Sequence, residues 1–212
     1  LGFSEKEMKH LSYGMVLLPE GKIKSREGLV VEADDIIEKV RKLAEKEITK
    51  RTRLSKSKLN ERSKKIALAS IKYMLLKSDI KKDLVFNPKE SISFDGNTGA
   101  YILYSYARAN SIIKKIRKIN KIKIKELNEK EIEIIKELSL FPNLVLSAYR
   151  SLNPSLIANY SYRLSKLFNE FYNSYRVLGS ENEVFRIYLV KTFKQTIKNS
   201  LYLLGIETVE EM

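Results

Sequence analysis

The stretch that decides the fold is DGNTGAYILYSYAR, residues 95–108. After its two glycines, the spacing of side chains follows the period of an α-helix, which turns by about 100° per residue. One predicted stripe combines tyrosines with polar and cationic groups: Tyr101, Tyr104, Arg108, Ser111 and Lys115. The other is apolar: Ile102, Tyr106, Ala109, Ile113 and Ile116. The segment therefore predicts a helix over about 98–118 with one core face and one face of tyrosines and cations.

The tyrosine stripe has two interpretations. Unstacked bases of single-stranded nucleic acid are held by aromatic rings with cations close by, and Tyr104 with Arg108 offers that combination. Tyrosines at helical spacing also commonly pack against a neighbouring helix. Helical phase alone leaves both interpretations open.

Downstream of Thr98 the sequence predicts helices throughout. Their expected ranges are 98–118, 128–139, 141–152, 154–178 and 183–204. Gly179 is expected to end the fourth of these helices, and Ser180 with Glu183 has the spacing of a capping box for the fifth. Helices joined by short loops predict a bundle.

Upstream of Thr98 the pattern is mixed. The apolar run 11–18 and the short run 29–31 predict two strands, and the polar loop 19–28 between them predicts a hairpin. Helices are expected over 33–48 and 60–78. Residues 83–97 are expected to be irregular, with possible short strands.

The chain of 212 residues is basic, with 40 Lys and Arg against 26 Asp and Glu, a net charge of +14. Because 43% of the residues are hydrophobic, a real core is expected rather than disorder. The charge favours a polyanionic partner, although a solvated lysine-rich surface would give the same excess. Two basic tracts stand out, 50–65 and 114–125.

Several classes of site and location are excluded by composition. There is no Cys, and His10 is the single histidine, so neither thiolate metal centres nor paired-histidine zinc sites are expected; no metal site is predicted. No apolar run of about 18 residues predicts a membrane helix, and no signal peptide is apparent. We expect a cytoplasmic protein. Because the first residue is Leu, we also expect it to be a piece of a longer chain.

The segment GKIKSREG, residues 21–28, places Lys22, Lys24 and Arg26 between two predicted strands. A glycine-bounded loop of this kind can close over a triphosphate and bring positive charge to a transition state. It can equally be an ordinary exposed hairpin tip.

Residues 95–108 closely resemble the Gly-x-Thr-Gly-Pro-Tyr-x-x-Tyr-x-x-x-Arg segment of arginyl-tRNA synthetases, with Ala100 in place of the commoner Pro. Residues 141–179 resemble the DALR-type helical domain of that family, and 201–212 resemble its ending, Leu-Leu-Gly-Ile followed by Glu-x-Met. The resemblance covers nearly the whole chain. It implies a mainly α protein: the end of a class I, Rossmann-like catalytic domain with a small strand hairpin over 1–97, then a helical anticodon-binding bundle over 98–212.

The resemblance also implies roles for the first part of the chain. Residues 10–40 resemble the segment that carries the KMSKS-like loop, in which Ser25 stands where the consensus has its second Lys. The implied catalytic residues are Lys22, Lys24, Ser25 and Arg26. The implied contacts to ATP, bound with Mg²⁺ in the full-length enzyme, are His10, Tyr13, Met15 and Val16.

For the second part, the resemblance implies an anticodon site. Its candidate residues are Tyr101, Tyr104, Arg108, Lys115, Tyr175 and Met212. Some family members have a Trp near the anticodon where this chain has Gly179, and Tyr175 is the candidate to replace that stacking platform.

The implied function is that of the C-terminal part of a monomeric arginine–tRNA ligase, which activates arginine with ATP and transfers it to tRNA(Arg). The His-x-Gly-His motif of class I enzymes needs two histidines, so this chain alone is expected to be inactive. An alternative is a free-standing, noncatalytic tRNA-binding protein derived from the synthetase. A further alternative is a helical scaffold with an incidental basic face. An upstream His-x-Gly-His motif and a tRNA-elbow domain would favour the ligase.

Overall fold

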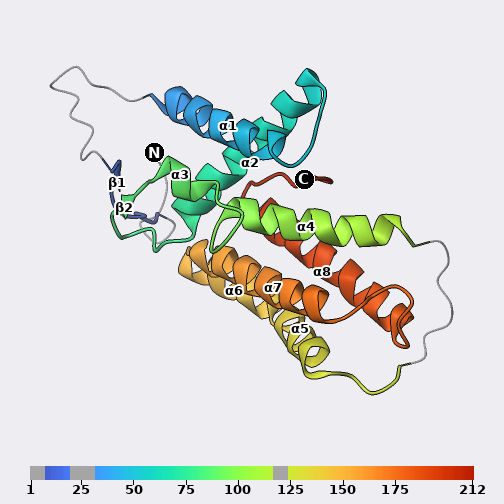
Figure 1. The fold of residues 1–212 in the computed structure, drawn as a ribbon. Coiled ribbons are helices and arrows are strands. Elements are labelled where there is room, and N and C mark those ends of the chain that lie inside the picture. The colour runs from blue at the N-terminus through green and yellow to red at the C-terminus, as the bar shows by residue number, and fades with distance from the viewer. Residues whose placement is uncertain (1–7, 20–31, 117–123) are drawn as a thin grey trace.

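A computed structural model describes residues 8–19, 32–116 and 124–212, and these parts of the chain are mainly helical (Figure 1). The helices are α1 (Ala33–Thr49), α2 (Lys56–Leu76), α3 (Pro88–Ser91), α4 (Gly99–Lys114), α5 (Glu129–Ser139), α6 (Phe141–Ser151), α7 (Ser155–Ser174) and α8 (Glu183–Leu203). The strands are β1 (Val16–Leu17) and β2 (Leu84–Val85). In Figure 1, α1 and α2 lie on one side of α4, and α5 to α8 lie on the other. The prediction of a mainly α chain is confirmed.

The described sheet is a pair of parallel strands. β1 is shorter than the predicted strand over 11–18, and it pairs in parallel with β2, with Val16 opposite Leu84. A parallel pair needs a long connection between its strands, and here α1 and α2 lie between them in the chain. The second predicted strand, 29–31, lies outside the described residues.

The core is continuous from α1 to α8. On α1, Val40, Ala44 and Ile48 are buried against α2, whose Ile66 and Tyr73 are fully buried. Helix α4 lies at the centre, in contact with α2, α7 and α8. Of the predicted apolar stripe, Ile102, Tyr106 and Ala109 are fully buried, and Ile113 and Ile116 are partly buried. Between α7 and α8, the rings of Phe168 and Phe193 stack with centroids 3.9 Å apart.

Two predicted helix ends are wrong. Helix α7 ends at Ser174 rather than near residue 178, so Gly179, with φ of 73°, lies in the connection to α8 instead of closing the helix. The predicted capping box of α8 does not form. The Ser180 hydroxyl donates to the Val177 carbonyl oxygen at 2.9 Å, and the N-cap position is taken by Asn182, which makes no side-chain cap bond.

The segment after α8, residues 205–212, is called the tail below. It turns at Gly205, where φ is 65°, and it then passes between α2 and α4 (Figure 1). Ile206 and Val209 are buried, and the Asn110 side-chain amide of α4 donates to the Glu210 carbonyl oxygen at 2.8 Å. The tail is therefore anchored to the core.

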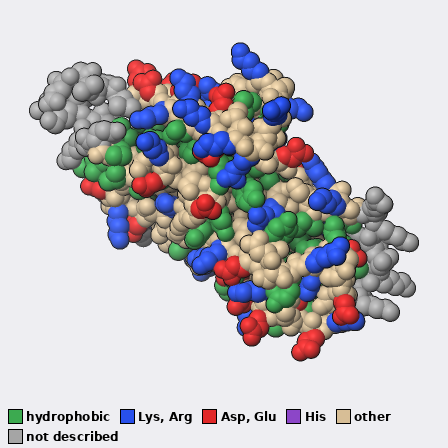
Figure 2. Space-filling view, in the orientation of Figure 1, with side chains coloured by type: hydrophobic (Ala, Val, Ile, Leu, Met, Phe, Trp, Pro, Cys, Tyr) green, Lys and Arg blue, Asp and Glu red, His purple; other side chains and the backbone are tan. Residues whose placement is uncertain are grey.

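Charges of both signs are spread over the face shown in Figure 2, where Lys and Arg side chains lie interspersed with Asp and Glu. No helix within the described residues is both long and apolar enough to cross a membrane.

Candidate nucleic-acid interface

Helix α4 begins at a close crossing with α2, and this crossing explains the Gly-Asn-Thr-Gly sequence. A Cβ placed on Gly99 would lie 2.6 Å from the backbone oxygen of Ala69 and 2.9 Å from Cβ of Tyr73, closer than a side chain permits. Thr98 is the N-cap, and its hydroxyl oxygen accepts from the Tyr101 amide at 3.1 Å. Local sequence therefore fixes both where α4 starts and how near it lies to α2.

A polar network holds this start in place. The Tyr73 hydroxyl of α2 lies 2.5 Å from Oδ1 of Asn97 and 2.9 Å from the carbonyl oxygen of Ala158 in α7. Asn159 of α7 donates to the Lys77 carbonyl oxygen at 2.9 Å. The Asn97 side-chain amide also donates to Oδ1 of Asn159 at 3.3 Å, so α2 and α7 are both tied to the residues just before α4.

The stripe opens onto a hollow of about 260 Å³ between α4, α7 and the tail. The hollow is lined by Tyr104, Ala107, Arg108, Ser111, Ile112, Lys115, Tyr172 and Met212. Two of these side chains, Arg108 and Lys115, are cations, and among the described residues that line the hollow none has a carboxylate side chain. The hollow thus combines aromatic rings with positive charge.

Arg108 is held between two aromatic rings. Its guanidinium carbon lies 4.7 Å from the ring centroid of Tyr104 and 4.5 Å from that of Tyr172, distances typical of cation–π contacts. Its Nη1 donates to Oδ1 of Asn169 at 2.5 Å, and its Nη2 donates to the Tyr104 hydroxyl at 3.0 Å. These contacts preorganise the guanidinium before any ligand binds, and its other N–H groups remain to serve as donors.

The predicted residues divide into three groups. Tyr104, Arg108, Lys115 and Met212 meet in the hollow. Tyr175 lies beside a neighbouring hollow, which shares Ile112, Lys115 and Tyr172 with the first. Tyr101 lies elsewhere: its ring packs on that of Tyr162 at 5.6 Å, and burial raises the pKa of its phenol. That these residues bind an anticodon stays a prediction.

Two residues at the hollow, Asn169 and Tyr172, are not among the candidates predicted from the sequence. The side-chain amide of Asn169 donates to the Ser105 hydroxyl at 2.7 Å while its oxygen accepts from Arg108, so it joins α7 to α4. Tyr172 follows one helical turn later and is 40% exposed. A signal was available, because both lie within residues 141–179, which resemble the DALR-type domain, and their spacing of three residues puts them on one helix face.

The predicted nucleotide-binding residues lie on and before β1. Tyr13 is 81% exposed, and Met15 and Val16 are about half exposed. The backbone of Met15 is already engaged, since its N–H donates to Asp83 at 2.7 Å and its carbonyl oxygen accepts from Leu84 at 2.9 Å. His10 is exposed. No cluster of His, Asp or Glu within the described ranges could hold a metal ion.

The predicted catalytic residues, Lys22, Lys24, Ser25 and Arg26, lie outside the described residues, as does part of the basic tract 114–125.

Comparison with protein families gives two matches. Residues 102–212 match the family described as DALR anticodon binding domain. Residues 1–88 match the one described as tRNA synthetases class I (R), catalytic domain. The first part of the chain is therefore similar to the catalytic domain of class I synthetases, and the second part has the fold of a helical anticodon-binding domain. The chain belongs to the DALR anticodon binding domain family.

Similar proteins confirm the predicted resemblance to arginyl-tRNA synthetases. An arginine–tRNA ligase of Flavobacterium psychrophilum is 43% identical over 220 residues, covering 100% of this chain and 37% of that protein. Another, of Borreliella burgdorferi, is 43% identical over 222 residues and covers 100% and 38%. The Thermus thermophilus arginyl-tRNA synthetase structure superposes with a TM-score of 0.86 at 28% identity, covering 96% of this chain and 35% of that one. The Plasmodium falciparum arginyl-tRNA synthetase gives 0.81 at 26% with the same coverage. The chain spans little more than a third of the curated relatives it matches.

Proposed function

We propose that this chain is the part of an arginine–tRNA ligase that binds the anticodon stem-loop of tRNA(Arg). The observation that carries the proposal is the hollow in which Tyr104 and Tyr172 flank a preorganised Arg108. An unstacked base can lie on either ring, while Arg108 and Lys115 supply donors and positive charge. The match to curated arginine–tRNA ligases supports arginine tRNA as the cognate RNA.

The rest of the proposed activity concerns the whole protein. We propose that it uses ATP with Mg²⁺ to activate arginine, that it transfers the arginine to tRNA(Arg), and that it works as a cytoplasmic monomer. In this proposal, 1–97 is the end of the catalytic domain and 98–212 is the anticodon-binding domain. His10, Tyr13, Met15 and Val16 lie near the nucleotide, with Lys22, Lys24, Ser25 and Arg26 on the closing loop. The match of 1–88 to the class I catalytic family supports this division.

The proposal can be tested with the 212-residue chain and two fluorescent RNA hairpins. One carries the anticodon stem-loop of an arginine tRNA, and the other has the same stem with its anticodon bases replaced. Fluorescence anisotropy at fixed ionic strength gives both dissociation constants. We expect the cognate hairpin to bind at least about tenfold more tightly, since each base stacked on an aromatic ring contributes about 1–3 kcal/mol. Equal affinity for the two hairpins would refute anticodon recognition.

The basic tract 50–65 should contribute differently. Cations that contact phosphates bind all sequences alike, and each contact removed lowers the salt dependence of binding. Replacing Lys56 and Lys58 by Ala should therefore weaken both hairpins by the same factor and flatten the plot of log affinity against log salt. A loss confined to the cognate hairpin would contradict this assignment.

A further inference from the structure

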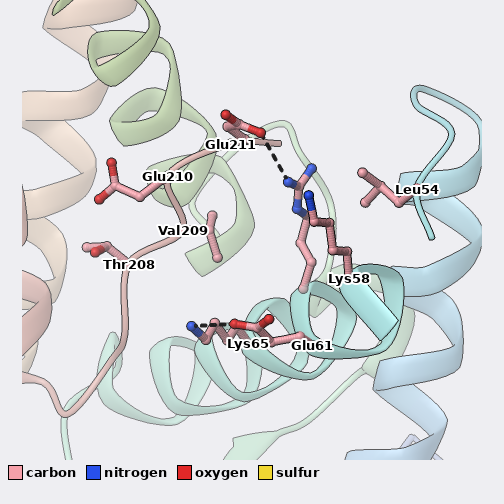
Figure 3. Close-up of a pocket in the computed structure, with 9 residues that line it drawn as sticks. Leu54, Lys58, Glu61, Lys65, Thr208, Val209, Glu210 and Glu211 are labelled. Carbon is pink, nitrogen blue, oxygen red and sulfur yellow. Dashed lines mark ion pairs between the residues drawn. The ribbon is translucent and has the colours of Figure 1, made fainter. Parts of the chain in front are cut away.

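The tail lies along a groove of about 310 Å³ on α2, where Glu210 and Glu211 face the cations Lys58, Arg62 and Lys65 (Figure 3). The groove is lined by Leu54, Lys58, Glu61, Arg62, Lys65 and the tail residues 208–211. Glu210 fixes the tail there, because the Tyr106 hydroxyl donates to its carboxylate at 3.0 Å and Lys194 pairs with it at 3.5 Å. The next side chain, Glu211, is 60% exposed.

The Glu211 carboxylate bridges two helices. Nζ of Lys114 in α4 lies 2.7 Å from Oε1, and Nη2 of Arg62 in α2 lies 3.6 Å from Oε2 (dashed in Figure 3). The hydrogen bond from Lys114 holds the pKa of Glu211 below its ordinary value, and the charges of Lys114, Arg62 and Lys58 act in the same direction. Cations from two elements therefore converge on one anion.

The ion pair between Arg62 and Glu211 is long, although the Arg62 side chain is largely shielded from solvent. The Arg62 side chain is only 15% exposed, yet 3.6 Å exceeds the roughly 2.7–2.9 Å of a charge-assisted hydrogen bond. A guanidinium fork suits the oxygens of a phosphate as well as those of a carboxylate. The cluster and the hollow are linked by chain neighbours: Lys115, which follows Lys114, and Met212, which follows Glu211, both line the hollow.

We propose that Lys58, Arg62 and Lys114 form a binding site for an RNA backbone phosphate, and that Glu211 occupies this site until the phosphate displaces it. The proposal rests on the proposed function, since it places the phosphate next to a nucleotide held in the Tyr104 hollow. Because Glu210 anchors the tail, the Glu211 side chain can move away from the phosphate site while the tail backbone stays in place.

The test is hairpin binding by Glu211→Gln, measured at low salt with the full 212-residue chain. Removing the competing carboxylate should tighten binding about threefold, because an exposed ion pair is worth little, and the gain should shrink as salt screens the site. Glu133→Gln is the matched control. It removes the same charge from an exposed ion pair with Lys130 on α5, and it should leave the affinity unchanged. Equal tightening in both variants would show a net-charge effect and overturn the proposal.

Arg62→Ala makes the test specific. In the original chain this change removes a contact to the phosphate and also releases the competitor, so the two effects partly offset each other. In the Glu211→Gln background only the contact is lost, so Arg62→Ala should weaken binding more there. Identical losses in both backgrounds would contradict competition at Arg62. Thermal melting of each variant checks that the fold is kept.

The experiment distinguishes failure of the phosphate site from failure of the proposed function. Tightening by Glu211→Gln should be the same for the cognate and the anticodon-substituted hairpin, because a phosphate contact carries no sequence information. If neither hairpin binds, the proposed function fails. If both bind and Glu211→Gln leaves their affinity unchanged or weaker, the phosphate site alone is refuted.

Discussion

Replacing Tyr104 by Ala tests the candidate site most directly. The change removes a ring that forms one wall of the hollow, together with its contact to Arg108 at 4.7 Å and its hydrogen bond to Nη2 at 3.0 Å. Arg108 keeps its bond to Asn169 and its contact with Tyr172. The wall opposite Tyr104 should therefore persist, and the variant should lose a stacking surface without losing the site.

The expected magnitude follows from that geometry. Losing one base–aromatic stack costs about 1–3 kcal/mol, so the dissociation constant for the cognate hairpin should rise by about five- to 150-fold. Tyr104→Phe keeps the ring and loses only the bond to Arg108. It should stay within a few-fold of the original affinity, because the bond to Asn169 and the contacts with both rings still hold the guanidinium.

The assay is a double-mutant cycle in which Tyr104→Ala is combined with each anticodon substitution. If Tyr104 stacks on a given base, the loss should shrink when that base is already changed, since one contact cannot be lost twice. Tyr149→Ala is the matched control, because Tyr149 is 76% exposed on α6 and takes no part in the hollow. Additive effects at every anticodon position would refute stacking, and a Phe variant as weak as the Ala variant would assign the loss to the hydroxyl.

Three further predictions follow from other parts of the chain. Arg186→Met should lower the free energy of unfolding by about 3–5 kcal/mol in urea titrations, because Glu131 is fully buried and pairs with Arg186 at 2.6 Å; a loss below about 1 kcal/mol would contradict this. Gly99→Ala should cost about 1–3 kcal/mol of stability, measured by thermal melting, since its Cβ would meet the Ala69 backbone at 2.6 Å; an unchanged melting temperature would show that α2 and α4 can separate freely. In the full-length enzyme, Lys24→Ala should slow arginine-dependent pyrophosphate exchange by an amount on the order of 2–4 kcal/mol in activation free energy, with a smaller effect on tRNA binding; an unchanged rate would move the role to Lys22.

Features set by local sequence could be predicted, and features set by long-range packing could not. Helical phase placed Tyr104, Arg108 and Lys115 on one stripe because the period of a helix is the same in every context, and the structure opens that stripe onto a hollow. Tyr101 has the same phase, but it lies against Tyr162, and nothing in 95–108 reveals which helix will be its neighbour. The pairing of β1 with β2 likewise depends on residues far apart in the sequence.

The composition of the hollow shows why Tyr172 could not be predicted to line it. α4 contributes Tyr104 and Arg108, but the position of Tyr172 depends on how α7 is registered against α4. That register is fixed at Asn169, a buried amide that must find partners and finds them in Ser105 and Arg108 of α4. One turn further along α7, the ring of Tyr172 then lies against the guanidinium of Arg108. A buried polar residue of α7 thus specifies the packing of two helices and, through that packing, the geometry of the proposed binding site.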